Sequence, residues 1–300
     1  MSLGPYPSLE DVWARAAAMA PLVDYGRSVE GRPLRHVTLP GEGPLVCVTA
    51  GLHGLEWIGV QVALAVLEAG PLPGARLRVF PVLNPDGYAR TERQGGHGTV
   101  GELRCNARGV DLNRNFPLPW QARPSRIPFA GASEPGAATY RGPAPLSEPE
   151  TRALTDVLHA EPPHASANLH SFMGTLIAAR VWHLEDWRAY GQLCRAFRHA
   201  QGGWGYRRLG TPVFDVFTGE LEDWQHHVLG CWGVCVECFS VVASLRQHRR
   251  APSAFWRFNP ARPAEVVARD APAVRALLQH SLTLPPPRRC PQGIDALPHW

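Results

Sequence analysis

Four short motifs in this chain bring together residue types that can bind a metal ion and move a proton. In chain order they are His53-Gly54-Leu55-Glu56, Asp111-Leu112-Asn113-Arg114-Asn115-Phe116, Asn168-Leu169-His170-Ser171 and Val236-Glu237-Cys238. A catalytic zinc takes three protein ligands and keeps one position open, and two histidines with one glutamate are a usual set. The first and third motifs supply that set. The second supplies a guanidinium for an anionic group, and the last supplies an isolated carboxylate.

The spacing of His53, Glu56 and His170 predicts a shared cation. His53 and Glu56 lie three residues apart where an apolar run passes into a helical pattern, and positions i and i+3 of a helix face the same way. His170 ends another apolar run, and the C-terminal ends of parallel strands gather ligands at one edge of a sheet. The alternative is that His-x-x-Glu occurs by chance and that Glu56 merely suits a helix N-terminus.

Apolar periodicity predicts the elements that would hold these residues. Continuous apolar runs indicate strands buried on both faces of a mostly parallel sheet, at residues 44–50, 77–83, 165–170 and 232–239. Shorter strands are expected near 22–25 and 34–39, and helices at 8–20, 55–68, 147–159, 187–201 and 263–282. A turn is expected at 84–87, a surface excursion at 118–146, and a capping box between Ser147 and Glu150. Strands alternating with helices indicate an α/β protein.

Composition narrows the class of protein. We expect one catalytic domain over residues 1–284 and a Pro-rich tail over 285–300, because no linker or repeat divides the 300 residues. No apolar run is long enough for a membrane span, and the N-terminus lacks the pattern of a signal peptide. The net charge of +4 comes without a basic stripe, so no nucleic-acid partner is expected. Seven cysteines, an odd number, favour reduced thiols and a cytoplasmic location.

With these motifs in order, the chain resembles the zinc metallocarboxypeptidases, the M14 or funnelin family. The resemblance rests on His53-x-x-Glu56, His170-Ser171, Asn113-Arg114 and Glu237, and on supporting fragments at 26–32, 84–88, 140–142 and 147–150. It spans about residues 22 to 240. The segment from Arg104 to Phe116 is most similar in style to the bacterial, murein peptide amidase-like branch. The resemblance implies a single-domain α/β/α sandwich with a twisted, mixed sheet of about eight strands.

The resemblance also implies roles for individual residues. Glu237 stands in a wholly apolar stretch, where a carboxylate is costly unless it is paired or used, and it matches the family's general base. An acid that reaches water or an arginine at a strand end is the alternative. Arg104 matches the family's oxyanion-stabilising arginine, with Arg90, Arg93 and Arg108 as competitors. Asn113 and Arg114 match the pair that grips the terminal carboxylate of the substrate.

Two features bear on how the substrate would be held. The family's mobile tyrosine is missing from the stretch 212–217, and nothing in the sequence argues for Tyr206 as its replacement. Glu222 precedes Asp223-Trp224 at a position that lines the specificity pocket in some family members, where an acid would favour a cationic side chain. An exposed acid on a polar loop is the slightly favoured alternative.

Two other groups of residues are predicted to have no part in the site. Cys231, Cys235 and Cys238 are expected to pack rather than bind metal. His226-His227 could line the rim of the pocket, but a solvated helix surface is the favoured interpretation.

These observations predict a zinc-dependent carboxypeptidase or peptide amidase. It would use one Zn²⁺ and a zinc-activated water to cleave a peptide or amide bond next to a residue with a free carboxylate. The substrate would be a peptide or an amino-acid amide. Two alternatives remain: an N-acyl amino acid deacylase of the aspartoacylase type, which Asn84-Pro85-Asp86-Gly87 argues against, and a non-catalytic binding protein on the same scaffold.

Overall fold

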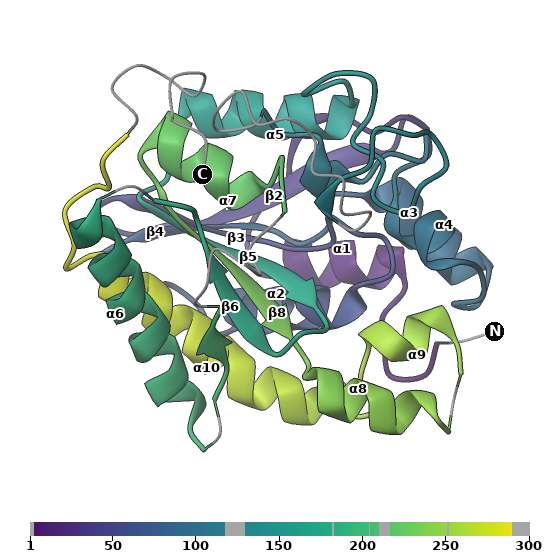
Figure 1. Ribbon diagram of the computed structural model, residues 1–300. Coiled ribbons are helices and arrows are strands. Elements are labelled where there is room, and N and C mark those ends of the chain that lie inside the picture. The colour runs from purple at the N-terminus through teal and green to yellow at the C-terminus, as the bar shows by residue number, and fades with distance from the viewer. Residues whose placement is uncertain are drawn as a thin grey trace.

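A mixed sheet of eight strands runs through the computed structural model, which describes residues 3–117, 130–181, 183–203, 205–209, 217–250 and 252–289 (Figure 1). In spatial order the strands are β1 (Val23–Arg27), β2 (Pro33–Leu39), β4 (Arg76–Phe80), β3 (Leu45–Thr49), β5 (Ala165–Ser171), β8 (Trp232–Cys238), β6 (Thr175–Ala178) and β7 (Arg207–Arg208). The central strands β4, β3, β5 and β8 are parallel, whereas β1–β2, β2–β4 and β8–β6 are antiparallel.

Helices cover both faces of this sheet. The α-helices are α1 (Leu9–Ala17), α2 (Trp57–Glu68), α3 (Pro85–Arg93), α4 (Val100–Arg104), α5 (Pro149–Ala160), α6 (Leu184–Gln201), α7 (Leu221–Trp224), α8 (Val241–His248), α9 (Ala254–Phe258) and α10 (Pro263–Ser281). A 3-10 turn, η1 (Leu112–Arg114), and a π-helical turn, η3 (Gln225–Leu229), complete the set. The helices α1, α2, α6 and α10 pack on one face, and α5 and α7 pack on the other (Figure 1). The predicted α/β/α sandwich is therefore confirmed.

Alternation along the strands separates a wholly apolar face from a face that carries chemistry. In β5, Ala167 and Leu169 point into the core under α2 and α10, so Asn168 and His170 point to the opposite face, since strand side chains alternate. In β8, Val236 and Cys238 join the same core. Glu237 therefore shares a face with His170, its direct partner in the parallel register.

Two local predictions were wrong because nearby side chains supplied stronger signals. Residues 84–87 begin helix α3 rather than a turn, since the Asn84 side chain accepts from the Gly87 amide at 2.9 Å and Pro85 occupies the first turn. Helix α5 has Glu148 at its N-cap, without a side-chain capping bond. The expected capping residue Ser147 instead donates to the Glu148 carboxylate at 2.8 Å, and Glu150 accepts from the Val29 amide, in the turn between β1 and β2, at 3.0 Å.

Several short elements went unpredicted, and some boundaries moved. Strand β4 ends at Phe80 rather than at 83, and α4, α8, α9, β6 and β7 lack a strong apolar periodicity in the sequence. Part of the predicted surface excursion, residues 118–129, lies outside the described residues, as does the tail from 290 onward. The described start of the tail lies against the π-helical region: the Trp232 indole donates to the Pro285 carbonyl at 3.0 Å, and Arg289 donates to the Leu229 carbonyl at 2.6 Å.

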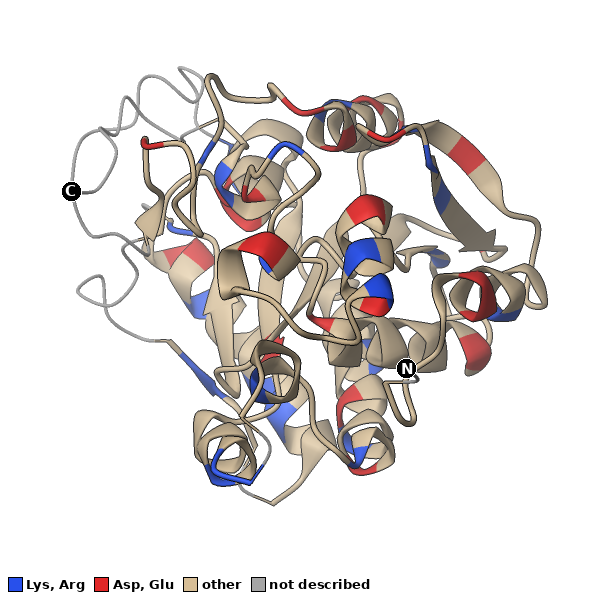
Figure 2. Ribbon diagram, turned by 90° about the vertical axis from the view of Figure 1, so that its right-hand side faces the viewer, with Lys and Arg blue, Asp and Glu red and all other residues tan. Residues whose placement is uncertain are grey.

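Charged residues of both signs lie on the side of the molecule that Figure 2 draws. Figure 2 shows arginine and acidic positions interspersed along the helices and loops turned toward the viewer. Among the described helices, none is both long enough and apolar enough to cross a bilayer.

Candidate active site

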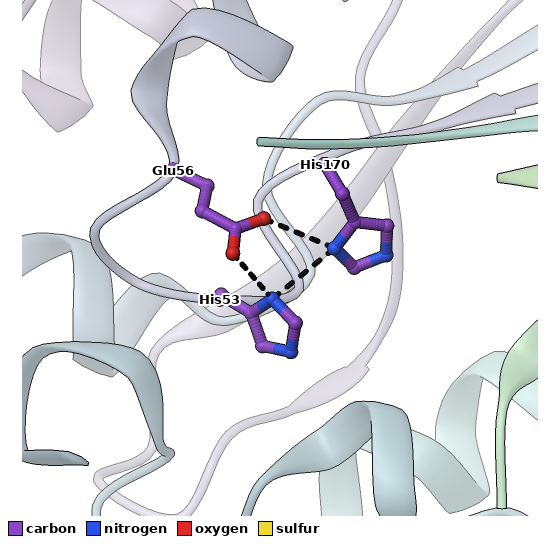
Figure 3. Close-up of side chains that lie close together, drawn as sticks. All are labelled: His53, Glu56 and His170. Carbon is purple, nitrogen blue, oxygen red and sulfur yellow. Dashed lines mark hydrogen bonds and ion pairs between the residues drawn. The ribbon is translucent and has the colours of Figure 1, made fainter. Parts of the chain in front are cut away.

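The three predicted metal ligands converge where strands β3 and β5 end (Figure 3). Glu56, the N-cap residue of α2, places one carboxylate oxygen 2.8 Å from His53 Nδ1 and the other 3.0 Å from His170 Nδ1. The two Nδ1 atoms lie 3.1 Å apart, and all three side chains are buried. They form the one group of three or more His, Cys, Asp or Glu in the described part of the chain whose ligand atoms could hold a metal ion.

The donor set fits zinc in both chemistry and size. Zinc–nitrogen and zinc–oxygen bonds of about 2.0–2.2 Å in a tetrahedral site place ligand atoms roughly 3.3–3.5 Å apart. The observed separations of 2.8–3.1 Å need only a small outward shift to reach that spacing. Two imidazole nitrogens and one carboxylate leave a fourth position for water or substrate, which is the pattern of a catalytic rather than a structural site.

Asp111 orients His53 for metal binding, a role that the sequence did not reveal. Its carboxylate lies 3.0 Å from His53 Nε2 and accepts from Arg104 Nε at 2.8 Å. A proton on Nε2 donated to Asp111 leaves the Nδ1 lone pair facing the site, as a carboxylate–histidine–metal arrangement requires. Burial opposes the charge on Asp111, but Arg104 and His53 outweigh burial and hold the pKa of Asp111 well below its usual value. The indication available in the sequence was that this acid begins the motif Asp111-Leu112-Asn113-Arg114.

The protonation tendencies of Glu56 and His170 suit cation binding. Burial lowers the pKa of His170, which favours the neutral imidazole that a metal needs. Burial alone would raise the pKa of Glu56, but His53 and His170 outweigh it and lower that pKa. The carboxylate therefore stays charged. His53 differs, because the nearby Glu56 and Asp111 carboxylates outweigh burial and Arg104 and raise its pKa; a metal ion would compete with that proton.

Arg104 is the arginine that reaches the metal ligands. Besides Asp111, its guanidinium approaches Glu56 Oε1 at 3.4 Å. The competing arginines lie elsewhere: Arg90 donates to the backbone carbonyls of residues 105 and 106, Arg108 faces Glu148 on the surface, and Arg93 is exposed. Burial would lower the pKa of Arg104, but its two carboxylate partners raise it, so a permanent cation stands beside the ligands.

Glu237 lies next to His170 on the neighbouring strand, with no arginine in ion-pair contact among the described residues. One carboxylate oxygen accepts from the Met173 amide at 3.3 Å. Burial, followed by the negative charge of Glu56, raises the pKa of Glu237 to about 7. A carboxylate whose pKa lies near neutrality can both take and return a proton. The alternative of an acid neutralised by an arginine at the strand end does not match this geometry.

Asn113 and Arg114 form a second, positively charged centre on turn η1. The Asn113 side-chain oxygen accepts from the Leu221 amide at 3.0 Å, which ties the turn to helix α7. Arg114 donates to the Asn113 carbonyl at 2.7 Å and lies 3.5 Å from Glu220. The Phe217 ring lies 4.8 Å from its guanidinium carbon. In these surroundings Arg114 is buried, with 5% of its surface exposed. Its planar guanidinium group still has the geometry to bind a carboxylate.

Glu222 is fully buried, so the expectation of an exposed acid on a polar loop was wrong. It lies on α7 with its carboxylate 3.4 Å from the Asn168 amide nitrogen, and Asn168 also donates to Gln225 at 2.9 Å. Asn168 belongs to the same strand and the same face as His170. Glu222 is therefore a buried acid on the face of the sheet that carries the ligands.

The π-helical turn after α7 also contradicts the sequence interpretation. His226 and His227 are buried, not solvated: His226 Nδ1 lies 3.0 Å from the Tyr190 hydroxyl, and His227 Nε2 lies 2.8 Å from the Arg180 carbonyl. The polar residues of this segment did not indicate, in the sequence, that helix α6 covers it.

The remaining candidates have structural roles or fall outside the description. Tyr206 does not line the site, since its hydroxyl donates to Asp270 at 2.7 Å and accepts from the Phe239 amide at 2.8 Å. Cys231, Cys235 and Cys238 are buried and free, in line with packing. Of the stretch 212–217, only Phe217 lies within the described residues.

Comparison with known proteins identifies the class. A family profile described as zinc carboxypeptidase, peptidase M14, matches residues 6–69 and 72–241. The chain therefore belongs to the zinc carboxypeptidase family, and the resemblance inferred from its motifs is confirmed.

Individual relatives agree with this assignment. Carboxypeptidase A6 of Homo sapiens is 31% identical over 256 residues, which cover 74% of this chain and 57% of that protein. A metallocarboxypeptidase A-like protein of Trichophyton verrucosum is 30% identical over 203 residues, 62% of this chain and 43% of its own length. The chain thus spans about half the length of these curated relatives.

Solved structures show the same fold. Bovine thrombin-activatable fibrinolysis inhibitor, solved with a tick carboxypeptidase inhibitor, superposes with a TM-score of 0.75 at 18% identity, covering 94% of this chain and 99% of that one. The murein-tripeptide amidase of Escherichia coli O157 gives a TM-score of 0.52 at 26% identity, covering 83% and 95%. The likeness to the bovine protein shows a shared fold alone, whereas the likeness to the amidase also includes sequence similarity.

We expect Asp111→Asn to weaken zinc binding about 10- to 100-fold, because the amide orients and polarises His53 less well than the carboxylate. His53→Ala should lose most of the metal outright. Zinc content after dialysis against a competing chelator measures both effects, and Asp24→Asn on exposed strand β1 is the matched control. A full equivalent of tightly held zinc in His53→Ala would place the metal elsewhere.

Proposed function

We propose that this protein is a zinc-dependent hydrolase that removes or releases a residue with a free carboxylate, as a metallocarboxypeptidase or peptide amidase. The observation that carries the proposal is the convergence of buried His53, Glu56 and His170 beside Glu237 and Arg104. Family membership supports the reaction class. The substrate class comes from the chain's own anchor and pocket residues, because the relatives it matches are longer proteins with their own substrates.

Glu237 is assigned the proton transfers. Zinc bound by the three ligands would supply Lewis-acid activation of water and of the scissile carbonyl. Glu237 takes the proton of the attacking water and delivers it to the leaving nitrogen, which needs a carboxyl group whose pKa is not far from the working pH. Its position opposite His170 in the strand register puts this carboxylate beside the ligands.

Arg104 is assigned the stabilisation of developing negative charge. Its guanidinium is already held by Asp111 at 2.8 Å, so little reorganisation is needed as the carbonyl oxygen gains charge. An arginine suits this role because it stays protonated and offers several donors. The ion pair with Asp111 therefore serves two partners: it orients His53 and it fixes the cation.

Arg114, with Asn113, is assigned the recognition of the terminal carboxylate. A guanidinium fork binds a carboxylate through two parallel hydrogen bonds, and a fixed cation in this position accounts for cleavage next to a free carboxylate. Its neighbours, Glu220 and Phe217, hold the fork from the side and from the face.

Glu222 is assigned the choice of side chain. It occupies a position that lines the specificity pocket in some family members, and a carboxylate there favours a cationic group, such as a lysine, an arginine or the amino end of diaminopimelate.

The cytoplasmic location expected from the cysteine count stays a prediction, which cell fractionation tests.

The experiment that tests the proposal is a substrate screen on zinc-loaded and chelator-treated protein. Peptides with free and amidated C-termini, muropeptides and N-acyl amino acids separate a carboxypeptidase or amidase from an N-acyl amino acid deacylase. We expect zinc-dependent hydrolysis of the first two classes. Turnover of N-acyl amino acids alone would favour the deacylase, and no turnover of any class would favour a binding protein.

Glu237→Gln should keep zinc and lose kcat by on the order of a hundredfold or more, as expected when a general base is removed. The amide is nearly isosteric, so the fold and the three metal ligands stay in place. Kinetics with parallel zinc analysis measures the effect, and Glu134→Gln on an exposed loop is the control. Near-normal kcat in the zinc-loaded variant would remove Glu237 from the mechanism.

Arg114→Ala should raise KM strongly for substrates with a free carboxylate, by about a hundredfold, because a charge-assisted fork contributes a few kcal/mol. Amidated analogues should be affected little, since they offer the fork no anionic partner. The ratio of kcat/KM for the two substrates is the measurement. Equal losses for both would mean that Arg114 supports folding rather than recognition.

Glu222→Gln should reduce a preference for C-terminal Lys over C-terminal Phe by at least roughly tenfold, because the neutral amide no longer pairs with the ammonium group. The comparison of kcat/KM for the two peptides, on wild type and variant, is the measurement. Wild type without a preference for Lys, or a preference that survives the substitution, contradicts the assignment.

A further inference from the structure

The turn that follows Glu237 has a backbone conformation that needs support from outside the turn. Strand β8 ends at Cys238, and Ser240 is the N-cap of helix α8, so Phe239 makes the turn between them. Phe239 has a φ of +65°, in the left-handed region that residues with a bulky side chain seldom adopt. Such a conformation persists only where surrounding contacts hold it.

The hydroxyl of Tyr206 supplies one such contact. It accepts from the Phe239 amide at 2.8 Å and donates to the Asp270 carboxylate at 2.7 Å. Burial, followed by the charge of Asp270, raises the pKa of Tyr206, so the hydroxyl keeps the proton that it donates. Tyr206 is buried, and its ring stacks on Phe197 of α6. Packing therefore fixes the ring, and the hydrogen bond to Asp270 fixes the hydroxyl.

Asp270 is itself held by the helices that cover this side of the sheet. It lies fully buried on α10 and accepts from Gln201 Nε2 at 2.7 Å and from Arg269 Nε at 2.9 Å. Arg269 also donates to the Tyr206 hydroxyl, and the Gln201 side-chain oxygen accepts from the Tyr206 amide at 2.6 Å. A buried polar network between α6 and α10 therefore reaches the backbone two residues after Glu237.

A second connection joins the same turn to Glu237 through the loop between β5 and β6. Gly174 in this loop packs against Ser240, since a Cβ at Gly174 would lie 2.8 Å from Ser240 Cα and 2.9 Å from Ser240 Cβ. The preceding residue, Met173, donates its amide to the Glu237 carboxylate at 3.3 Å. Because the loop rests on Ser240, a displacement of the Phe239 turn also displaces the Met173 amide. The turn thus supports Glu237 through its backbone and through its carboxylate.

We propose that Tyr206 is a positioning residue for Glu237: its hydroxyl, fixed by Asp270, holds the Phe239 turn and thereby sets where the Glu237 carboxylate lies relative to the metal ligands. The inference rests on the proposed function, because the proton transfers assigned to Glu237 belong to it. Tyr206 itself contacts neither the metal ligands nor Glu237 in any listed bond of its hydroxyl, which is taken up by Phe239, Asp270 and Arg269. A role in stability alone is the rival explanation, and it predicts different results.

The first arm of the test is kinetic. Values of kcat and KM for a peptide with a free C-terminus are measured on zinc-loaded wild type, Tyr206→Phe, Glu237→Gln and the double variant Tyr206→Phe/Glu237→Gln. Tyr88→Phe is the matched control, because Tyr88 is also buried and its hydroxyl donates to the Pro7 carbonyl at 2.7 Å. Zinc content and thermal unfolding are recorded for every variant.

The second arm does not depend on turnover. The chain contains three methionines, so isotope labelling of methionine gives an NMR spectrum with very few backbone amide signals. The signal of Met173 is assigned by its loss in Met173→Leu. Because this amide donates to Glu237, its chemical shift and its rate of exchange with solvent report the contact between the loop and the carboxylate.

We expect Tyr206→Phe to lower kcat about tenfold, since small displacements of a catalytic group are costly, and to change KM by less than roughly twofold. Zinc content should stay at one equivalent. The Met173 signal should move in Tyr206→Phe and stay in place in Tyr88→Phe. In the double variant, kcat should be no lower than in Glu237→Gln alone, because residues that act through one another are not additive.

Three results would overturn the inference: an unmoved Met173 signal in Tyr206→Phe, a loss of kcat no greater than in Tyr88→Phe, or a double variant in which the two losses of kcat multiply. If Tyr206→Phe does not fold, Asp270→Asn, which keeps the phenol but weakens its anchor, is measured in its place with the same expected pattern. If wild type hydrolyses no substrate, the proposed function fails, whereas the Met173 signal still decides whether Tyr206 holds the loop against Glu237.

Discussion

The buried carboxylate of Asp111 is the contact on which the rest of the site depends. One oxygen faces His53 and the other holds Arg104, so a single side chain sets the orientation of a metal ligand and the position of the cation beside it. The residues that follow extend the same logic. Asn113 ties the turn to helix α7, Arg114 is the proposed carboxylate anchor, and the Asn115 side chain donates to the Arg141 carbonyl. One short turn therefore fixes the position of the candidate metal ligands relative to the proposed anchor and to helix α7.

The parallel register of β3, β5 and β8 provides a rigid support for the site. Alternation sends every second side chain of β5 and β8 into an apolar core, and the residues between them carry the chemistry. Because strands in register place equivalent residues side by side, His170 and Glu237 are neighbours although 67 positions separate them in the printed numbering. The site thus rests on strand ends and on one helix start, which are more precise supports than free loops.

The sequence predicted the parts of the site that depend on local pattern. Glu56 and His53 follow from i, i+3 spacing, and the face of Glu237 follows from apolar alternation. The burial of Glu222, His226 and His227 could not be predicted in this way, since polar letters in a short segment look the same whether or not a helix covers them. The capping box failed for a related reason: Ser147 and Glu150 found tertiary partners that the local motif cannot reveal. The sequence shows that Arg141 and Asp111 are charged, but only the fold shows which charged groups lie near them.

Charge balance explains why such a costly arrangement is kept. Around the ligands, Glu56 and Asp111 are buried carboxylates, Glu237 is a half-buried one, and Arg104 supplies one fixed cation, which leaves an excess of two negative charges when Glu237 is ionised and the histidines are neutral. The raised pKa of Glu237 is the local sign of that excess, since the charge of Glu56 contributes to it. A divalent cation would balance the sum. Buried charges that are balanced only when ions are bound are expected at positions where function, rather than stability, determined the residue type. Binding a cation at these ligands would therefore relieve the excess negative charge that raises the pKa of Glu237.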